Sequence, residues 1–143
     1  MLQVFVDSDA FVALARERDA SHERALVLLK KLIRKQVVFH TSNYVFSESI
    51  TVISLRENHA AALEFIEQMQ SPESSYILMR ADDDLDNQAI STFQKQTSKN
   101  TSFVDCANMA FMRQLHADAI FSFDAVYRKN GFALVEDLFF KRK

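Results

Sequence analysis

The amino-acid sequence predicts one α/β domain, built on a parallel, twisted sheet with helices on both faces. Short apolar runs of strand length alternate with longer stretches of helical period along the whole chain, which is the pattern of repeated strand–helix–strand units. The chain has 143 residues, enough for one hydrophobic core. Its single glycine and single proline leave little material for tight hairpins. We find no internal repeat, low-complexity tract or linker, so the predicted domain is residues 1–143.

The composition excludes several classes of function. A glycine-rich phosphate loop or a dinucleotide-binding fingerprint needs several glycines, and a multi-cysteine zinc site needs more than the lone Cys106. One cysteine makes no internal disulfide, which favours a reducing, cytoplasmic compartment. We expect neither a signal peptide nor a membrane span, because no apolar stretch is long enough. The net charge of −2 gives no bulk basic field, but a local basic rim is enough to bind a nucleic acid.

The first predicted strand is followed by an acidic residue, Asp7. Residues 2–6 form an apolar run rich in β-branched and aromatic side chains, typical of a strand buried on both faces of a parallel sheet. The run stops at Asp7-Ser8-Asp9, and apolar residues resume at helical spacing from Phe11. Asp7 is therefore placed at the carboxyl end of a central strand, the edge at which open α/β sheets bind ligands. The structural alternative is that Ser8 or Asp9 only caps the following helix.

The other elements are predicted from periodicity and from polar breaks. Further strands are expected over residues 37–40, 119–123 and 132–135, and residues 76–79 form a strand or a buried connection. Helices are expected from Ser21 for about sixteen residues, over 43–57, over 59–70, from the acidic cluster 82–86 to about 96, and from Ser102 through 115. We interpret the acidic cluster as solvated residues of a first helical turn, not as a metal site.

Glu48 stands in the middle of the predicted helix over residues 43–57. This helix is apolar nearly all round, so we expect it to be largely buried. A carboxylate on such a helix is costly unless it is paired or binds a cation. The alternative to a ligand role is a buried salt bridge with an arginine.

Two further acids occupy similar positions. Asp105 lies in the first turn of the helix that begins after Ser102, with capping-box spacing that also offers a purely structural role. Asp124 follows the apolar run 119–123, which repeats the arrangement of Asp7. Strand ends and helix N-termini of one parallel sheet meet at one edge, where several carboxylates would repel one another unless cations lie between them. All-oxygen sites of this kind select Mg²⁺ or Mn²⁺, which is the usual apparatus for cleaving phosphodiesters.

The sequence also resembles the PIN domain family, and within it the VapC-type toxins of prokaryotic toxin–antitoxin pairs. The resemblance rests on the segments VFVDSDAFVAL, TSNYVFSESI, TSFVDCANMAFM and AIFSFDAVYRKNGF. It implies a Mg²⁺- or Mn²⁺-dependent ribonuclease that cuts single-stranded RNA, with a catalytic and metal-binding set of four carboxylates, Asp7, Glu48, Asp105 and Asp124. It also implies a homodimer that a small antitoxin protein neutralises.

The motifs suggest substrate contacts and contain two departures from the family pattern. Ser8 and Ser122 occupy the hydroxyl positions of their motifs, and Arg128 and Lys129 form a basic turn suited to a phosphate path. Asp9 stands where the family usually has a neutral residue, which adds negative charge. Tyr127 stands where the family usually has phenylalanine.

Two other functions compete with the nuclease prediction. Asp7-Ser8-Asp9 fits the start of the motif of haloacid-dehalogenase-type phosphatases, in which the first Asp is the nucleophile. The second alternative is a PIN-like binding or scaffolding subunit without catalysis. For partners, the adjacent Phe139 and Phe140 near the basic end of the chain predict a contact with a second copy of the chain or with an antitoxin segment.

Overall fold

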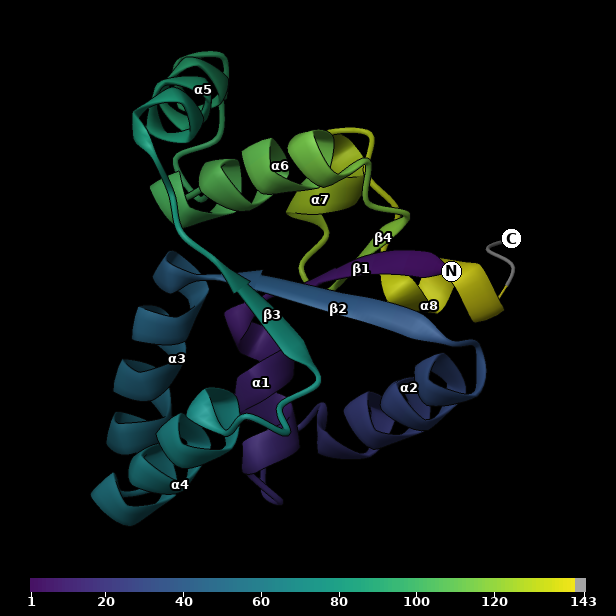
Figure 1. Cartoon of the computed structure of the whole chain (residues 1–143). Helices are drawn as coiled ribbons and strands as arrows, with labels where there is room; N and C mark the ends of the chain where they lie inside the picture. Colours follow the sequence, from purple (N-terminus) through teal and green to yellow (C-terminus); the bar gives the residue numbers. More distant parts are fainter. Residues whose placement is uncertain (141–143) are drawn as a thin grey trace.

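A four-stranded parallel sheet forms the centre of the computed structural model, which describes residues 1–140 (Figure 1). The strands are β1 (Leu2–Val6), β2 (Val37–Ser42), β3 (Tyr76–Met79) and β4 (Ala119–Phe121), in the order β3-β2-β1-β4. The predicted parallel α/β sheet is confirmed, and the undecided segment 76–79 is a strand that pairs with β2. The last three residues of the predicted domain 1–143 lie outside the described residues.

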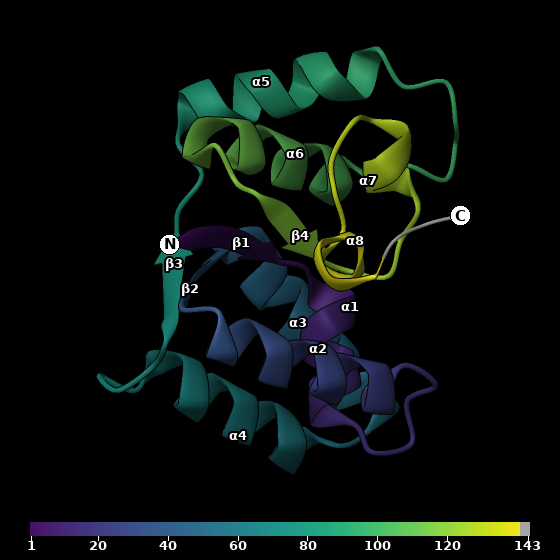
Figure 2. The same ribbon diagram turned by 90° about the vertical axis from the view of Figure 1, so that its right-hand side faces the viewer.

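Helices cover both faces of the sheet, as predicted (Figures 1 and 2). One face is covered by α1 (Ser8–Ala15), α2 (His22–Arg34), α3 (Asn43–Arg56) and α4 (His59–Gln70). The other face is covered by α6 (Phe103–Leu115), with α5 (Asp83–Gln94) packed outside it and the short α7 (Val126–Lys129) beside it. The short α8 (Val135–Phe139) lies beside β4. None of the helices within residues 1–140 is long and apolar enough to cross a membrane.

The strand order places a topological switch point at β1. The chain proceeds outward from β1 to β2 and β3, then returns across the sheet to place β4 on the other side of β1. The crossovers on the two sides of β1 therefore lie on opposite faces. Beyond the carboxyl ends of the strands this leaves a crevice, which is where open α/β sheets bind ligands.

The core explains why β1 reads as one apolar run. Val4, Phe5 and Val6 are fully buried, because helices pack on both sides of the strand. On one face, Phe5 stacks on Phe111 of α6 with ring centroids 5.6 Å apart. On the other face, the rings of Phe11 of α1 and Tyr76 of β3 pack edge to face, with their centroids 5.1 Å apart. These contacts fix the ends of β1, α1 and α6 relative to one another.

The predicted strand over residues 132–135 is wrong. The chain pairs with β4 at a single parallel bridge between Ile120 and Leu134, and α8 begins at the next residue. The reason is local, because a carboxylate oxygen of Asp137 accepts a hydrogen bond from the Leu134 backbone N–H at 2.9 Å. That cap starts a helix before a second residue of this segment can pair with β4.

The prediction that the helix over residues 43–57 is largely buried is also wrong. Only Val45, Ser49 and Ile53 of α3 are buried, and Leu55 is 81% exposed. The helix packs on α1 and α4 along one stripe, so the apolar residues off that stripe face solvent. Glu48 lies on the exposed side and forms no salt bridge within residues 1–140, which removes the buried-pair alternative.

Candidate active site

Asp7 lies directly after β1 at the switch point, and donors surround its carboxylate. It is the N-cap of α1, and its Oδ1 accepts hydrogen bonds from the Ser8 backbone N–H at 2.7 Å and from Nδ2 of Asn108 at 3.0 Å. Its Oδ2 accepts from the hydroxyl of Tyr127 at 2.7 Å and from that of Ser122 at 3.3 Å. The helix cap is therefore Asp7 itself, and not one of the two residues after it as the structural alternative held.

Asp105 has a structural role and also faces the site. The predicted capping box is present: the Asp105 backbone N–H donates to Oγ of Ser102 at 3.0 Å, and Oδ2 of Asp105 accepts from the Ser102 backbone N–H at 2.9 Å. The other oxygen, Oδ1, lies 3.3 Å from the hydroxyl of Tyr127. The cap uses one oxygen and leaves the other beside the Tyr127 hydroxyl, which also binds Asp7, so the structural and ligand roles are compatible.

Asp9 and Asp124 approach the same site from α1 and from the loop after β4. Oδ2 of Asp9 accepts hydrogen bonds from the Phe123 backbone N–H at 2.8 Å and from the hydroxyl of Ser122 at 3.0 Å. The Asp124 backbone N–H donates to Oγ of Ser122 at 3.2 Å, and Oδ1 of Asp124 accepts from the Val126 backbone N–H at 2.9 Å. Asp9 therefore ties the loop that presents Asp124 to the start of α1.

Glu48 completes the acidic group from α3. Although much of its surface is exposed, burial of part of the side chain raises its pKa above the ordinary value, and the negative charge of Asp105 adds to that rise. The hydroxyl of Ser8 lowers the pKa of Glu48, because it stabilises the ionised carboxylate. Glu48 lines the same groove as Ser8 and Asp9.

Burial and mutual repulsion raise the pKa values of the two innermost acids. Burial in the protein raises the pKa of Asp7 from 3.8 to about 8, with the charge of Asp9 as the next cause. Burial likewise raises the pKa of Asp9 to about 6, and the charge of Asp124 adds to this, while hydrogen bonds from Phe123 and Ser122 oppose it. Shared hydrogen bonds place these carboxylates together, because the Tyr127 hydroxyl lies between Asp7 and Asp105 and the Ser122 hydroxyl lies between Asp7 and Asp9.

The donor set has the chemistry of a site for a hard divalent cation. The Tyr127 and Ser122 hydroxyls join Asp7 to Asp105 and to Asp9, whereas Glu48 and Asp124 are exposed. Within residues 1–140 none of these five carboxylates forms an ion pair. Oδ1 of Asp9 is buried and has no hydrogen-bond partner among these residues. Among the described residues, no group of three or more His, Cys, Asp or Glu side chains is arranged so that it could hold a metal ion. Instead, the hydroxyls of Tyr127 and Ser122 lie between the carboxylates, so an ion would have to displace a hydroxyl.

The four residues predicted to contact substrate have different surroundings. Ser8 and Ser122 are buried, at 8% and 2% exposure, and serve the carboxylates. Arg128 donates from Nε and Nη2 to two carboxylates of α8, at 2.7 to 3.0 Å, which balances its charge. These contacts raise its pKa further. Lys129 is exposed on the surface.

Three residues important for the geometry were not assigned a role from the sequence. Asn108 is fully buried and donates to both Asp7 and Tyr127, the latter at 2.9 Å. Its signal was present in the sequence, since a polar residue three positions after Asp105 lies on the same helix face. Asp9 and Tyr127 were noted only as departures from a pattern. Nothing local predicted that the hydroxyl of Tyr127 reaches the site.

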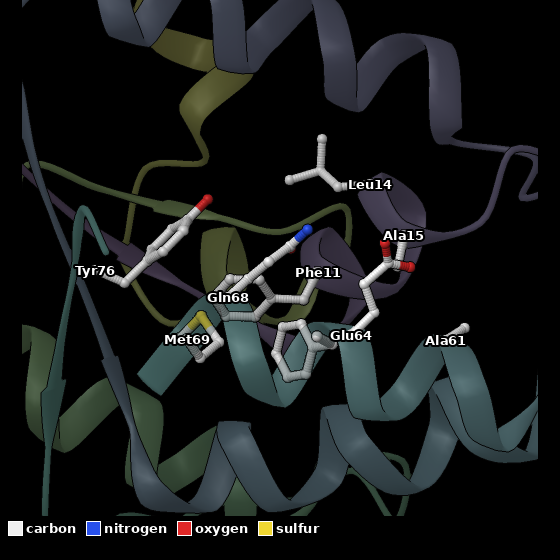
Figure 3. A pocket seen from close by; sticks show the side chains of 9 residues that line it. Phe11, Leu14, Ala15, Ala61, Glu64, Gln68, Met69 and Tyr76 are labelled. Carbon is white, nitrogen blue, oxygen red and sulfur yellow. The ribbon is translucent and has the colours of Figure 1, made fainter. Parts of the chain in front are cut away.

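A groove of about 210 Å³ adjoins the acidic site between α1, α3 and the loop after β4. Its lining combines acidic, basic and aromatic residues, including Asp9, Glu48, Arg56 and Phe123. A separate pocket of about 270 Å³ lies between α1, α4 and β3, away from the carboxylates (Figure 3). Phe11, Leu14, Met69 and Tyr76 surround it, with Glu64 and Gln68 at its edge. The first groove is lined by two of the acids, Asp9 and Glu48.

Comparison with known proteins identifies the family. The model of the PIN domain matches residues 4–133. Two proteins named "23S rRNA-specific endonuclease VapC20", from two strains of Mycobacterium tuberculosis, are 30% identical over 132 residues, which cover 92% of this chain and 97% of each relative.

The solved structures give the same assignment. The crystal structure of M. tuberculosis VapC20, described as a sarcin-ricin loop cleaving toxin, superimposes with a TM-score of 0.79 and 28% identity, covering 91% of this chain and 96% of that one. FitAcB from Neisseria gonorrhoeae shares the fold, with a TM-score of 0.65 at 17% identity over 92% of this chain and 95% of that one. The predicted family is thus confirmed: the chain belongs to the PIN domain family.

Proposed function

We propose that this protein is a metal-dependent endoribonuclease that cleaves single-stranded RNA, and that it is the toxin of a toxin–antitoxin pair. The observation that supports this most is the group of carboxylates at the switch point of the sheet, which form no ion pair within residues 1–140. Burying carboxylates without a cation or an ion pair costs stability. The presence of such carboxylates favours a function that needs their charge.

Asp7, Glu48, Asp105 and Asp124 are the proposed holders of Mg²⁺ or Mn²⁺. Such an ion, when bound, supplies Lewis-acid activation of a water molecule and neutralises charge on the phosphate and the leaving oxygen. The protein's own part is to orient the ligands. Four hydrogen bonds fix Asp7, and the capping box fixes Asp105 so that its Oδ1 faces inward.

The RNA is proposed to approach through the groove beside the acids. Arg56 and Phe123 both line this groove. A groove that presents an arginine and an aromatic ring suits a phosphate and an unstacked base, which is how single-stranded RNA is bound. Lys129 stays a proposed phosphate contact, whereas the ion pairs of Arg128 favour a structural role. Ser8 and Ser122 are proposed to hold the carboxylates that face the substrate.

Two partners are proposed, an antitoxin protein and a second copy of the chain. The support is an apolar surface between α2 and α8, where a groove of about 220 Å³ is lined by residues that include Val27 and Phe140. Phe140 is 53% exposed, and Nζ of Lys31 lies 5.5 Å from its ring centroid. Removing residues 138–143 and measuring light scattering with and without the antitoxin tests this. An unchanged dimer and unchanged inhibition would refute the partner contact.

The proposed activity is tested with RNA and Mn²⁺ in the purified protein, which we expect to act in the cytoplasm. Ribosomal RNA is the first substrate to assay, because the relative's name specifies 23S rRNA. Endonucleolytic products that need Mn²⁺ and disappear with EDTA support the proposal. Absence of both cleavage and saturable Mn²⁺ binding would favour the scaffold alternative. A phosphorylated Asp7 would revive the phosphatase alternative, against which the family assignment already stands.

A further inference from the structure

The hydroxyl of Tyr127 lies at the centre of the acidic site. The residue is fully buried, and its hydroxyl donates to Oδ2 of Asp7 at 2.7 Å while lying 3.3 Å from Oδ1 of Asp105. The same oxygen accepts a hydrogen bond from Nδ2 of Asn108 at 2.9 Å. A phenylalanine would fill the same ring space, so the hydroxyl is not needed for packing. Its effect is on the two carboxylates that it joins.

Two hydroxyls approach Oδ2 of Asp7. Tyr127 donates to it at 2.7 Å, whereas the Ser122 hydroxyl lies 3.3 Å from it and closer, at 3.0 Å, to Oδ2 of Asp9. Oδ1 of Asp7 accepts hydrogen bonds from the Ser8 backbone N–H and from the Asn108 amide. A cation that binds Oδ2 of Asp7 therefore competes with the short hydrogen bond from Tyr127.

The hydroxyls of Tyr127 and Ser122 are the donors that a cation can displace from Oδ2 of Asp7. The Ser8 N–H is held by the start of α1, and the Asn108 side chain is buried within α6. Each hydroxyl, in contrast, carries one proton and has a second carboxylate in reach. Tyr127 can donate to Oδ1 of Asp105 at 3.3 Å, and Ser122 can donate to Oδ2 of Asp9 at 3.0 Å. Both can turn away from Oδ2 of Asp7 without losing every partner.

We propose that Tyr127 is a positioning residue whose hydroxyl competes with the divalent cation for Oδ2 of Asp7. The inference rests on the proposed metal-dependent function and concerns how strongly the site holds its ion. When Asp7 is ionised and no cation is bound, the polar O–H bridges Asp7 and Asp105 and reduces their repulsion. When a cation binds, it takes over this role and the hydroxyl turns to its second acceptor. The hydroxyl thus stabilises the metal-free state and weakens cation binding.

Two effects of opposite sign follow for Tyr127→Phe. Without the hydroxyl, the metal-free protein loses a hydrogen bond to a buried carboxylate, so it melts at a lower temperature in EDTA. The cation no longer has to displace that donor, so Mn²⁺ binds about tenfold more tightly. If the hydroxyl only held Asp7 in its productive orientation, Tyr127→Phe would bind Mn²⁺ more weakly than the wild-type protein.

The experiment is calorimetric titration of Mn²⁺ into metal-free protein, together with thermal melts in EDTA. The matched control is Tyr44→Phe, because the Tyr44 hydroxyl also donates to a carboxylate, Oδ1 of Asp86 at 2.6 Å, which is not one of the proposed ligands. We expect both variants to melt lower, and Tyr127→Phe alone to bind Mn²⁺ more tightly. Unchanged or weaker Mn²⁺ binding by Tyr127→Phe overturns the inference.

A second variant keeps the test decisive if Tyr127→Phe does not fold. Ser122→Ala removes the other hydroxyl on Oδ2 of Asp7 and is expected to tighten Mn²⁺ binding in the same direction by a smaller factor, since its 3.3 Å contact is longer. Unchanged or weaker binding by Ser122→Ala then overturns the inference. Absence of saturable Mn²⁺ binding by the wild-type protein is a different outcome, which refutes the proposed metal site itself.

Discussion

The metal-free protein is expected to lose stability as the pH rises through neutrality, and Asp7 is expected to be the main cause. Burial, followed by the charge of Asp9, raises the pKa of Asp7 from 3.8 to about 8 in the folded protein. In the unfolded chain the carboxyl returns to its ordinary value. Between pH 4 and pH 8 the folded state therefore binds more protons than the unfolded state, so the free energy of unfolding falls as pH rises.

The size of the effect follows from the two pKa values of Asp7. Each pH unit over which the folded state holds one extra proton changes the stability by about 1.4 kcal/mol. Because titration of Asp7 is half complete at pH 8, the loss between pH 6 and pH 8 is about 2 kcal/mol. For a domain of this size that corresponds to a fall of roughly 6 °C in Tm. Asp7→Asn removes the titrating proton and flattens this dependence.

Differential scanning calorimetry in EDTA from pH 6 to pH 8 measures this effect. The control is Asp83→Asn, which removes one exposed carboxylate at the start of α5, away from the acidic site, and is expected to retain the wild-type slope. In saturating Mn²⁺ the slope should reverse, because the ion binds the ionised carboxylates. A wild-type Tm in EDTA that does not fall, or an Asp7→Asn variant that falls just as steeply, would show that Asp7 is not held protonated by its surroundings.

The other predictions concern the ligands and the elements that hold them. Asp7→Asn and Asp105→Asn should abolish RNA cleavage in Mn²⁺ while the melts stay cooperative; retained cleavage would make these acids structural only. Asp9→Asn should be much milder, because an amide oxygen still accepts the hydrogen bonds from Phe123 and Ser122; a loss as complete as that of Asp105→Asn would contradict this. Ser102→Ala should lower stability by about 1 kcal/mol through loss of the cap, seen as a lower Tm, with an unchanged Tm as the contrary result.

The parts of this fold that were predictable from the sequence have local causes. The run before Asp7 is apolar at every core position because both faces of β1 are covered, so it reads as a central strand. Ser102 and Asp105 form a capping box at a spacing of three residues, which any helix start of that sequence can form. The alternation of such segments implied the parallel sheet, and the motifs around the acids implied the PIN domain family, which the comparisons confirm.

The errors arose where the outcome depended on distant neighbours. The apolar side chains of α3 did not reveal which stripe α1 and α4 would cover, so the exposure of Leu55 and Glu48 was missed. The segment 132–135 has the composition of a strand, but the cap from Asp137 ends the pairing after one bridge. In both cases the local structure depended on a neighbouring segment, and the composition of a segment does not show which neighbours it will contact.

The sequence by itself determined most of the helices and three of the four strands, the family, and the placing of Asp7 and Asp105 at element ends, because local patterning and short-range hydrogen bonds suffice for these. Only the tertiary structure decided what surrounds the acids. The hydroxyl of Tyr127 reaches Asp7 across 120 residues of sequence, and that of Ser122 reaches Asp9 across 113. The physical reason is that a hydrogen bond depends on a separation of about 3 Å in space, which only the packing of β1, β4 and α7 against one another sets.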